Sequence, residues 1–428
     1  MVPPAPRRLG GRIATVVVAS LLAACTSTVL PSPSPTISSA PSHAPTAAPA
    51  TASPGTGGSV DPVYGLIAAQ VEQIRGLRAT ADITPVVIDQ ATLRQNLEAD
   101  FNEANPAEAV EASERILKAL GLLPPDGSLR DEVIDLQAGQ VIGYYSPERD
   151  ELFVVSSAGG VGPTQRATYA HEYTHQLQDQ NFGLDKLGFD ATDQGDRSLG
   201  RLALVEGDAV TAQTRWMQAN LSANDLGQIV ADAADPAVLE ALQKAPAILR
   251  ETAFFPYQEG AILASALMVR SGYQGVDAAY ADPPDSTEQV LHPEKYLDRD
   301  PPAPVVVPAD LPTKLGAGWS AGGADTIGEL QLRIWLHEGG VPSTVASRAA
   351  AGWGGDRLML LDGPAGATAI ALITEWDTPA DADEFAAAAR SAIGGLNLSG
   401  LVSQAGRPTQ VRVAIGAQGA EVLAALGG

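Results

Sequence analysis

The sequence is poor in cysteine, histidine and basic residues, and each shortage excludes a class of protein. A single Cys in 428 residues rules out an intrachain disulfide and any cluster of thiolate metal ligands. The 27 Lys and Arg are outnumbered by 50 Asp and Glu, so the chain lacks the basic surface that nucleic-acid phosphates require. Only five His are present, which makes any grouping among them informative. A hydrophobic share of 45% argues for folded domains, and the length suggests two of them.

The first 60 residues predict an export signal followed by a tether. Three arginines at positions 7, 8 and 12 precede a 12-residue apolar run, Ile13–Ala24, which is too short to span a bilayer of about 30 Å but suits a signal-peptide core. The run ends in Leu22-Ala-Ala-Cys25, which resembles the lipobox of bacterial lipoproteins. This resemblance implies that residues 1–24 are removed and that Cys25 carries a lipid, which anchors an extracytoplasmic protein to the bacterial cell membrane. The alternative is an ordinary secretory signal that happens to contain a Cys.

Residues 25–60 are expected to be a disordered tether, with the folded body beyond them. Positions 26–60 are dominated by Ser, Thr, Pro, Ala and Gly and include no Asp, Glu, Lys, Arg or aromatic residue, so no apolar face can be buried. No later apolar run approaches 18 residues, so we expect membrane contact through the N-terminal lipid only. The segment Pro301–Pro308 predicts an extended connector that divides the body into domains at 61–305 and 306–428.

Periodicity and turn residues predict an α+β fold. In the first domain, apolar residues at helical spacing predict helices, and two β-rich runs around a turn predict a hairpin. The predicted helices cover 64–77, 91–101, 107–120, 165–182, 198–218, 236–249 and 258–270, and the predicted strands cover 85–89, 140–146 and 151–156. In the second domain, helices are predicted at 324–336 and 380–393 and strands at 357–361, 367–374 and 411–415, before a short terminal helix.

A candidate metal site lies in the predicted helix 165–182. The sequence His171-Glu-Tyr-Thr-His175 places two imidazoles on one face of a helix, where they can bind the same ion. Glu172 stands beside the first ligand and can accept a proton from the metal-bound water. A catalytic zinc usually has three protein ligands, and Glu206, on a later predicted helix with apolar neighbours, is the candidate for the third. Asp208 points away from Glu206 around that helix and is expected to be a supporting or structural group.

The pattern His-Glu-x-x-His followed by a Glu on a later helix resembles the gluzincin group of zinc metallopeptidases. Several sequence segments also resemble those of an uncharacterised family of bacterial gluzincin-like lipoproteins. These segments are Val141–Pro147, His171–Gln180, Ala203–Ala209, Phe255–Gly260, Ser286–Tyr296 and Gly352–Arg357. The resemblance implies a zincin-like core followed by a small α+β domain, one Zn²⁺ per chain, and a peptide or protein substrate. The thermolysin-like pattern has an Asp four residues after the Glu. Here that position is Val210, so support for a ligand His must come from elsewhere, and Asp179 is one candidate.

A peptidase also needs a hydrogen-bond donor for the oxyanion, typically a Tyr or a His. Tyr257, His292 and Tyr296 are the candidates, and a structural role at a helix end is the alternative for His292. The segment 353–357, Trp-Gly-Gly-Asp-Arg, is expected to form a turn and an ion pair. The acidic segment 185–196 is expected to be a solvated loop or a rim of the site, because it matches no calcium-loop spacing.

Three functional hypotheses remain open on this basis. The first is a membrane-tethered zinc metallopeptidase with His171, His175 and Glu206 as ligands and Glu172 as general base. The second is a binding or assembly lipoprotein that keeps the fold as a scaffold. The third is a zinc hydrolase that acts on another amide or ester, such as a cell-wall peptide. Metal content separates the second hypothesis from the others, and cleavage of a peptide library separates the first from the third.

Overall fold

The computed structural model describes residues 61–81, 84–147, 149–155, 160–189, 191–404 and 406–427. The predicted signal, Cys25 and the tether therefore lie outside the described residues. Within those residues the chain combines helices with two separate sheets, which agrees with the predicted α+β class. None of the described helices is long and apolar enough to cross a membrane.

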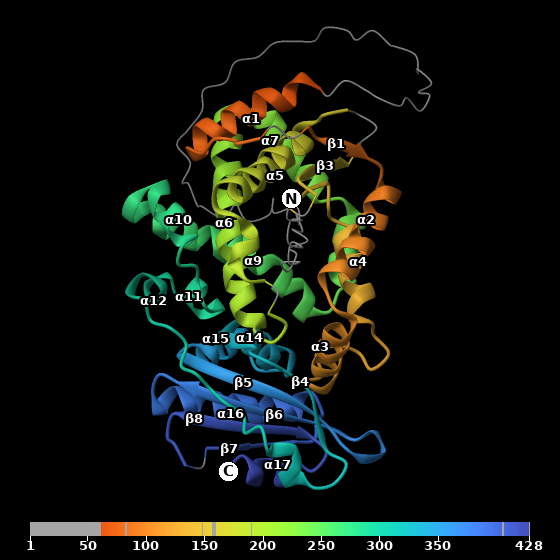
Figure 1. Ribbon diagram of the computed structural model, residues 1–428, viewed down its shortest axis with the longest axis vertical. Helices are drawn as coiled ribbons and strands as arrows, with labels where there is room; N and C mark the ends of the chain where they lie inside the picture. Colours follow the sequence, from red (N-terminus) through yellow and green to blue (C-terminus); the bar gives the residue numbers. More distant parts are fainter. Residues whose placement is uncertain are drawn as a thin grey trace, which may run out of the picture.

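The first half of the body, up to residue 300, is mainly helical (Figure 1). Its helices are α1 (Pro62–Arg75), α2 (Gln90–Ala104), α3 (Ala107–Ala119), α4 (Leu129–Ala138), α5 (Pro163–Phe182), α6 (Gly195–Asn220), α7 (Ala223–Ala233), α8 (Pro236–Lys244), α9 (Ala247–Ser271), α10 (Tyr273–Ala279), α11 (Thr287–Leu291) and α12 (Pro293–Asp298), with a short 3-10 helix, η2 (Leu184–Leu187). The two long helices α5 and α6 lie side by side near the middle of this half, and α9 packs against α6 (Figure 1).

A sheet of three strands lies against α5. β1 (Val86–Ile88) pairs parallel with β3 (Glu151–Val155), and β3 pairs antiparallel with β2 (Gly143–Ser146), which confirms the predicted hairpin. The order β1-β3-β2 leaves β2 at an edge of the sheet. A side chain at Gly143 would meet the carbonyl oxygen of Phe153 and the methyl group of Thr168 on α5. Glycine at this position therefore lets α5 lie directly on the hairpin.

Two prolines affect the helices in a way that the sequence prediction missed. The sequence predicted helices over 236–249 and 258–270, but α8 ends at Lys244 and α9 runs without a break from Ala247 to Ser271. Pro246 is the N-cap of α9, where its missing N–H is not needed. Pro256 lies inside α9 and removes one helical hydrogen bond, yet its neighbours Phe255 and Tyr257 are both buried. Tertiary packing thus keeps the helix intact through Pro256.

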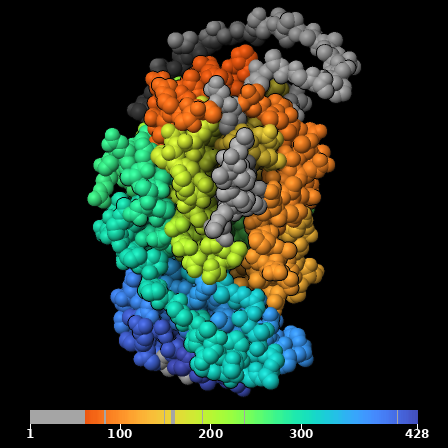
Figure 2. Space-filling view, in the orientation of Figure 1, coloured from red at the N-terminus to blue at the C-terminus, as the bar shows by residue number. Residues whose placement is uncertain are grey.

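The second half forms an antiparallel sheet of five strands with helices on it, at one end of the molecule (Figure 2, cyan to blue). Its strands are β4 (Ser320–Asp325), β5 (Trp353–Asp362), β6 (Thr368–Trp376), β7 (Gly400–Ser403) and β8 (Gln410–Gly416), in the order β4-β5-β6-β8-β7. Its helices are α13 (Leu311–Leu315), α14 (Gly328–Glu338), α15 (Ser343–Ala350), α16 (Pro379–Gly395) and α17 (Gly419–Ala425), with the 3-10 turn η3 (Pro364–Gly366).

The predicted start of one helix in this half was wrong. The sequence predicted a helix over 324–336, but residues 324 and 325 belong to β4, and α14 begins only at Gly328. The carboxylate of Asp356 on β5 accepts hydrogen bonds from the backbone amides of Ile327 and Gly328 at 3.0 and 2.7 Å. An acceptor distant in sequence therefore fixes where this helix begins, and no local pattern could reveal it.

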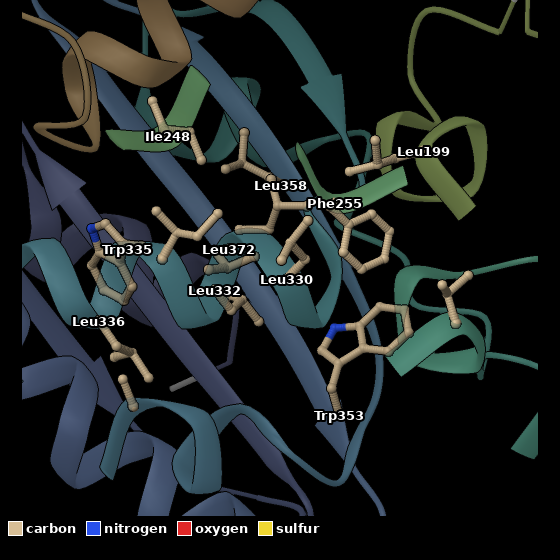
Figure 3. Packing of buried hydrophobic residues seen from close by; sticks show 14 of the residues in the cluster. Leu199, Ile248, Phe255, Leu330, Leu332, Trp335, Leu336, Trp353, Leu358 and Leu372 are labelled. Carbon is tan, nitrogen blue, oxygen red and sulfur yellow. The ribbon is translucent and has the colours of Figure 1, made fainter. Parts of the chain in front are cut away.

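The largest hydrophobic cluster crosses from the first half into the second (Figure 3). Leu199, Ile248 and Phe255 from α6 and α9 pack against side chains of α14, β5 and β6 such as Trp335 and Leu358. The indole N–H of Trp335 also donates a 3.1 Å hydrogen bond to the carbonyl oxygen of Leu120. The C-terminal sheet thus supports the helices above it through a continuous core.

Two glycines allow the backbones of helices α6 and α9 to lie in direct contact. A side-chain carbon at Gly207 would overlap the backbone carbonyl of Gly260, and one at Gly260 would overlap the carbonyl of Ala203. Any larger residue would therefore push the two helices apart. Gly207 directly follows Glu206, so this contact fixes the position of the candidate third ligand.

Candidate metal centre

Helix α5 carries both histidines and Glu172 in its buried middle section. It begins at Pro163, whose fixed φ suits a first helical position, and ends before Gly183, which has φ +74°. Every residue from Ala167 to Gln178 is buried. The polar side chains in this stretch are shielded from solvent, so each needs a hydrogen-bond partner inside the protein.

Helix α6 brings Glu206 to the same point. The helix extends from Gly195 to Asn220, and Leu204, Val205 and Glu206 are all at most 1% exposed. A buried carboxylate among apolar neighbours is costly unless a positive charge or hydrogen-bond donors stabilise it. The groups that face Glu206 are the two histidines of α5.

The donor atoms of the two histidines and of Glu206 form a nearly equilateral triangle. Oε2 of Glu206 lies 3.2 Å from Nε2 of His171 and 3.3 Å from Nε2 of His175, and the two Nε2 atoms are 3.0 Å apart. Ligands of a tetrahedral zinc ion at about 2.0–2.1 Å lie about 3.3–3.4 Å from one another, so this spacing fits one ion above the triangle. Within the described part of the chain, this is the only group of three His, Cys, Asp or Glu residues whose ligand atoms lie close enough together to hold a metal ion.

The charges in the triangle show that the site needs a cation or a proton. Burial raises the pKa of Glu206, but the two histidines outweigh it and lower this pKa to about 2. Burial lowers the pKa of His175, but the Glu206 carboxylate outweighs burial and raises this pKa to about 9. Burial also lowers the pKa of His171, which favours the neutral ring. Without a metal, the proton on His175 compensates the charge of Glu206; a divalent cation can take its place.

Glu172 is held beside the triangle by the edge strand of the small sheet. Its Oε2 accepts a 2.8 Å hydrogen bond from the backbone amide of Tyr145 on β2. Its Oε1 is buried and has no hydrogen-bond partner among the described residues. Burial raises the pKa of Glu172 well above its ordinary value. Oε2 is therefore held in place, and Oε1 has an unused acceptor capacity near the candidate metal ligands.

The outer support of His175 comes from a residue that the sequence prediction did not name. Nδ1 of His175 lies 2.8 Å from Oε1 of Gln178, one turn further along α5. The candidate Asp179 does not serve this role, because its carboxylate accepts hydrogen bonds from the Tyr145 hydroxyl and from the backbone amide of Leu184. A contact at i+3 on a helix was a usable signal, and Gln178 could have been found by it.

The three candidate oxyanion donors lie in different surroundings. Tyr257 on α9 is buried, and its ring stacks on that of His171 with the centroids 6.0 Å apart. His292, at the junction of α11 and α12, lies 3.0 Å from Oε1 of Glu329 on α14. Tyr296 is buried and donates its hydroxyl to the carbonyl oxygen of Asp282 at 2.7 Å. Of the three, the described contacts bring only Tyr257 to a metal-ligand candidate.

The segment 353–357 ties the C-terminal sheet to the start of α6. The indole N–H of Trp353 donates to Asp356 at 3.0 Å, and Arg357 forms a 2.6 Å ion pair with Asp193, so an ion pair is present as predicted. The predicted turn was wrong, because residues 353–357 are the first residues of strand β5. The segment 185–196 is not wholly solvated as predicted, because Asp196 is only 1% exposed and accepts hydrogen bonds from Thr287. Its backbone amide also donates to Thr326, which anchors the start of α6 on the second half.

Comparison with known proteins identifies one region. A family model described as a domain of unknown function, DUF8575, matches residues 315–424 and includes all five strands of the C-terminal sheet. No curated protein and no solved structure matches the chain. The matched region supports α6 from below but contains none of the residues of the metal-ligand triangle.

Proposed function

We propose that this chain is a zinc-dependent metallopeptidase of the gluzincin type, with one zinc ion per chain. The observation that carries the proposal is the convergence of His171, His175 and Glu206 within 3.0–3.3 Å, with the unpartnered Oε1 of Glu172 beside them. Two imidazole nitrogens and one carboxylate oxygen are a typical ligand set of catalytic zinc, and they leave a fourth position for water. An additional carboxylate that is buried next to this set has a clear use as a base.

Glu172 would act as the general base. Zinc bound at the triangle would lower the pKa of the attacking water to about 7 and would polarise the carbonyl of the substrate. Oε1 of Glu172 would then accept the proton of that water, while the amide of Tyr145 holds Oε2 in place. The raised pKa of Glu172 suits a group that later passes this proton to the leaving amine.

Tyr257 is the proposed donor to the oxyanion, in preference to His292. Tyr257 stacks on His171 and therefore lies at the metal centre, whereas His292 pairs with Glu329 on the second half of the chain. A donor must lie about 3 Å from the developing oxyanion to stabilise it. Only a residue next to the ligands satisfies this condition.

The location and the substrate class complete the proposal. A lipoprotein signal ending in the lipobox-like Leu22–Cys25 would put the enzyme outside the cytoplasm, attached to the bacterial membrane by a lipid on Cys25. The substrate would be a peptide or protein in that compartment. Hydrolysis of another amide or ester by the same zinc chemistry is the alternative.

Two measurements on the purified full-length protein test the proposal. Metal analysis should find about one zinc ion per chain in the wild type and none in His175→Ala, because two remaining ligands hold the ion poorly. A peptide library should be cleaved by the wild type only. Zinc without peptide cleavage but with hydrolysis of other amides or esters would favour the alternative substrate, and a metal-free wild type would refute the proposal.

A further inference from the structure

A buried polar network lies behind His175, on the side away from Glu206. Its centre is Asp208 on α6, which forms a 2.7 Å ion pair with Nε of Arg75 at the end of α1, both side chains being 0% exposed. Oδ2 of Asp208 also accepts hydrogen bonds from the hydroxyl of Tyr280 at 2.9 Å and from Nε2 of Gln178 at 3.0 Å. The network thus joins α1, α5 and α6 directly to the outer partner of a candidate zinc ligand.

The network determines which way the amide of Gln178 points. Nε2 of Gln178 faces two groups that can only accept, the carbonyl oxygen of Val205 and the carboxylate of Asp208, each at 3.0 Å. Turning the amide over would place its oxygen against both acceptors. Oε1 of Gln178 must therefore face His175, where it lies 2.8 Å from Nδ1.

The orientation of Gln178 in turn determines the tautomer of His175. An amide oxygen accepts a hydrogen bond only from a protonated nitrogen, so the proton of the neutral imidazole is on Nδ1. When the ring loses its second proton, the lone pair is on Nε2, and this is the nitrogen that lies 3.3 Å from Oε2 of Glu206. The ring therefore already points its metal-binding nitrogen at the triangle, and zinc displaces the proton from that nitrogen.

Arg75 keeps the network in this state. Its Nη2 forms a second ion pair with Asp277 on α10 at 2.6 Å, and its guanidinium lies 4.6 Å from the centre of the Tyr273 ring. A guanidinium cannot lose its proton in a protein, so Arg75 is a fixed positive charge beside Asp208. With Arg75 and Tyr280 both bound to it, the Asp208 carboxylate cannot rotate away from Gln178.

We propose that Gln178, held by Asp208 and Arg75, is a positioning residue that fixes the tautomer and the ring orientation of His175 for metal binding. The proposal rests on the metal site of the proposed function and adds to it the groups that set its affinity. Outer partners of this kind typically change metal affinity 10–100-fold when they are removed. The proposal also gives Asp208 a role as a support of a ligand and not as a ligand.

Three variants of glutamines on α5 test the proposal in the full-length protein. Zinc affinity is measured by competition with a fluorescent chelator. Gln178→Met removes both the acceptor and the donors and should weaken zinc binding 10–100-fold. Gln178→Glu keeps an acceptor for Nδ1 of His175, but its second oxygen must carry a proton to face the Asp208 carboxylate. This variant should therefore bind zinc within a fewfold of the wild type only while that carboxyl is neutral. Gln180→Met, two residues further on and bonded to Ala81, is the matched control and should leave zinc affinity unchanged.

The outcomes separate the positioning role from a structural one. If Gln178 only ties α5 to α6 through its donors, Gln178→Met should lower the stability of the protein and leave zinc affinity unchanged, and this result would overturn the proposal. Nitrogen-15 NMR of the histidines in zinc-loaded wild type should show Nδ1 of His175 protonated and Nε2 bound to zinc. This measurement does not depend on whether the variants fold. A proton on Nε2 would equally overturn it. A wild type that binds no zinc would instead refute the proposed function.

Discussion

Oε2 of Glu172 accepts a 2.8 Å hydrogen bond from the backbone amide of Tyr145, which attaches the metal-site helix to the edge strand of the small sheet. The bond uses one carboxylate oxygen and leaves the other, Oε1, buried without a hydrogen-bond partner among the described residues. In the proposed mechanism, Oε2 of this carboxylate has a structural role and Oε1 accepts the proton, and a substitution can separate the two roles.

Glu206→Gln should weaken zinc binding by more than the roughly 10–100-fold expected from loss of an outer partner. The amide keeps the size of the side chain but removes the negative charge opposite the two imidazoles, whose Nε2 atoms lie 3.2 and 3.3 Å away. Chelator competition measures the effect. Equal zinc affinity in Glu206→Gln and wild type would show that Glu206 is not a ligand.

Zinc binding should release at least one proton between pH 7 and pH 9. In the metal-free protein the Glu206 carboxylate raises the pKa of His175 to about 9, above the ordinary value of about 6.5, so this imidazole is protonated until zinc displaces the proton. Zinc affinity should rise about tenfold per pH unit up to about pH 9. Calorimetry at pH 7.5 in two buffers of different ionisation enthalpy counts the protons, and a count of zero would contradict the assignment.

The same shift makes the stability of the metal-free protein depend on pH. Because the folded-state pKa of His175 is raised above its unfolded value, this residue stabilises the fold fully below about pH 6.5, and the contribution is lost as pH rises through about 9. Denaturant unfolding of chelator-treated protein should therefore show a midpoint that falls over this range. In the His175→Gln variant, this part of the pH dependence should be missing.

Gly207→Ala and Gly260→Ala should each destabilise the protein by about 1–3 kcal/mol or more, because the added carbon overlaps the backbone of the other helix. Gly65→Ala and Gly227→Ala are matched controls on α1 and α7, where nothing lies within 4 Å of the new carbon. These controls should stabilise by about 0.4–1 kcal/mol. Thermal unfolding measures both sets, and a stable Gly207→Ala variant with unchanged zinc affinity would show that close α6–α9 packing does not position Glu206.

Cys25→Ser should abolish lipid attachment and remove the protein from the lipoprotein fraction, because the lipobox interpretation makes the Cys25 thiol the group that carries the lipid. Fatty-acid labelling of cells that express each form measures this. Labelling that persists in the variant would refute the lipobox interpretation, while zinc binding by the folded body should be unchanged in either case.

Much of the candidate metal site could be predicted because local sequence patterns indicate where His171, His175 and Glu206 lie. Helical spacing placed His171 and His175 on one face, and the apolar flank of Glu206 indicated a buried carboxylate. Gln178 and the Asp208–Arg75 pair were not predicted, since Arg75 and Asp208 are far apart in the sequence and meet only when α1 packs on α6. No spacing rule connects such residues.

The errors in predicting the fold have the same origin. Tertiary packing carries α9 through Pro256, and an Asp on another strand decides where α14 begins. In both places local propensity is overridden by contacts that only the assembled fold creates. The hairpin β2–β3 and the strands β5, β6 and β8 were predicted because turn residues and β-rich runs adjoin each other in the chain.

The zinc content and the peptidase rate of Glu172→Gln, measured on the same preparation, test the central claim most directly. The Gln carbonyl oxygen can still accept the Tyr145 amide hydrogen bond, so the fold and one zinc per chain should be retained. The amide cannot take a proton from water, so hydrolysis should fall by about 10²–10⁴. His171→Ala, which removes a ligand, should lose zinc and activity together. Zinc retained with activity within tenfold of the wild type would contradict the assignment of Glu172 as the general base.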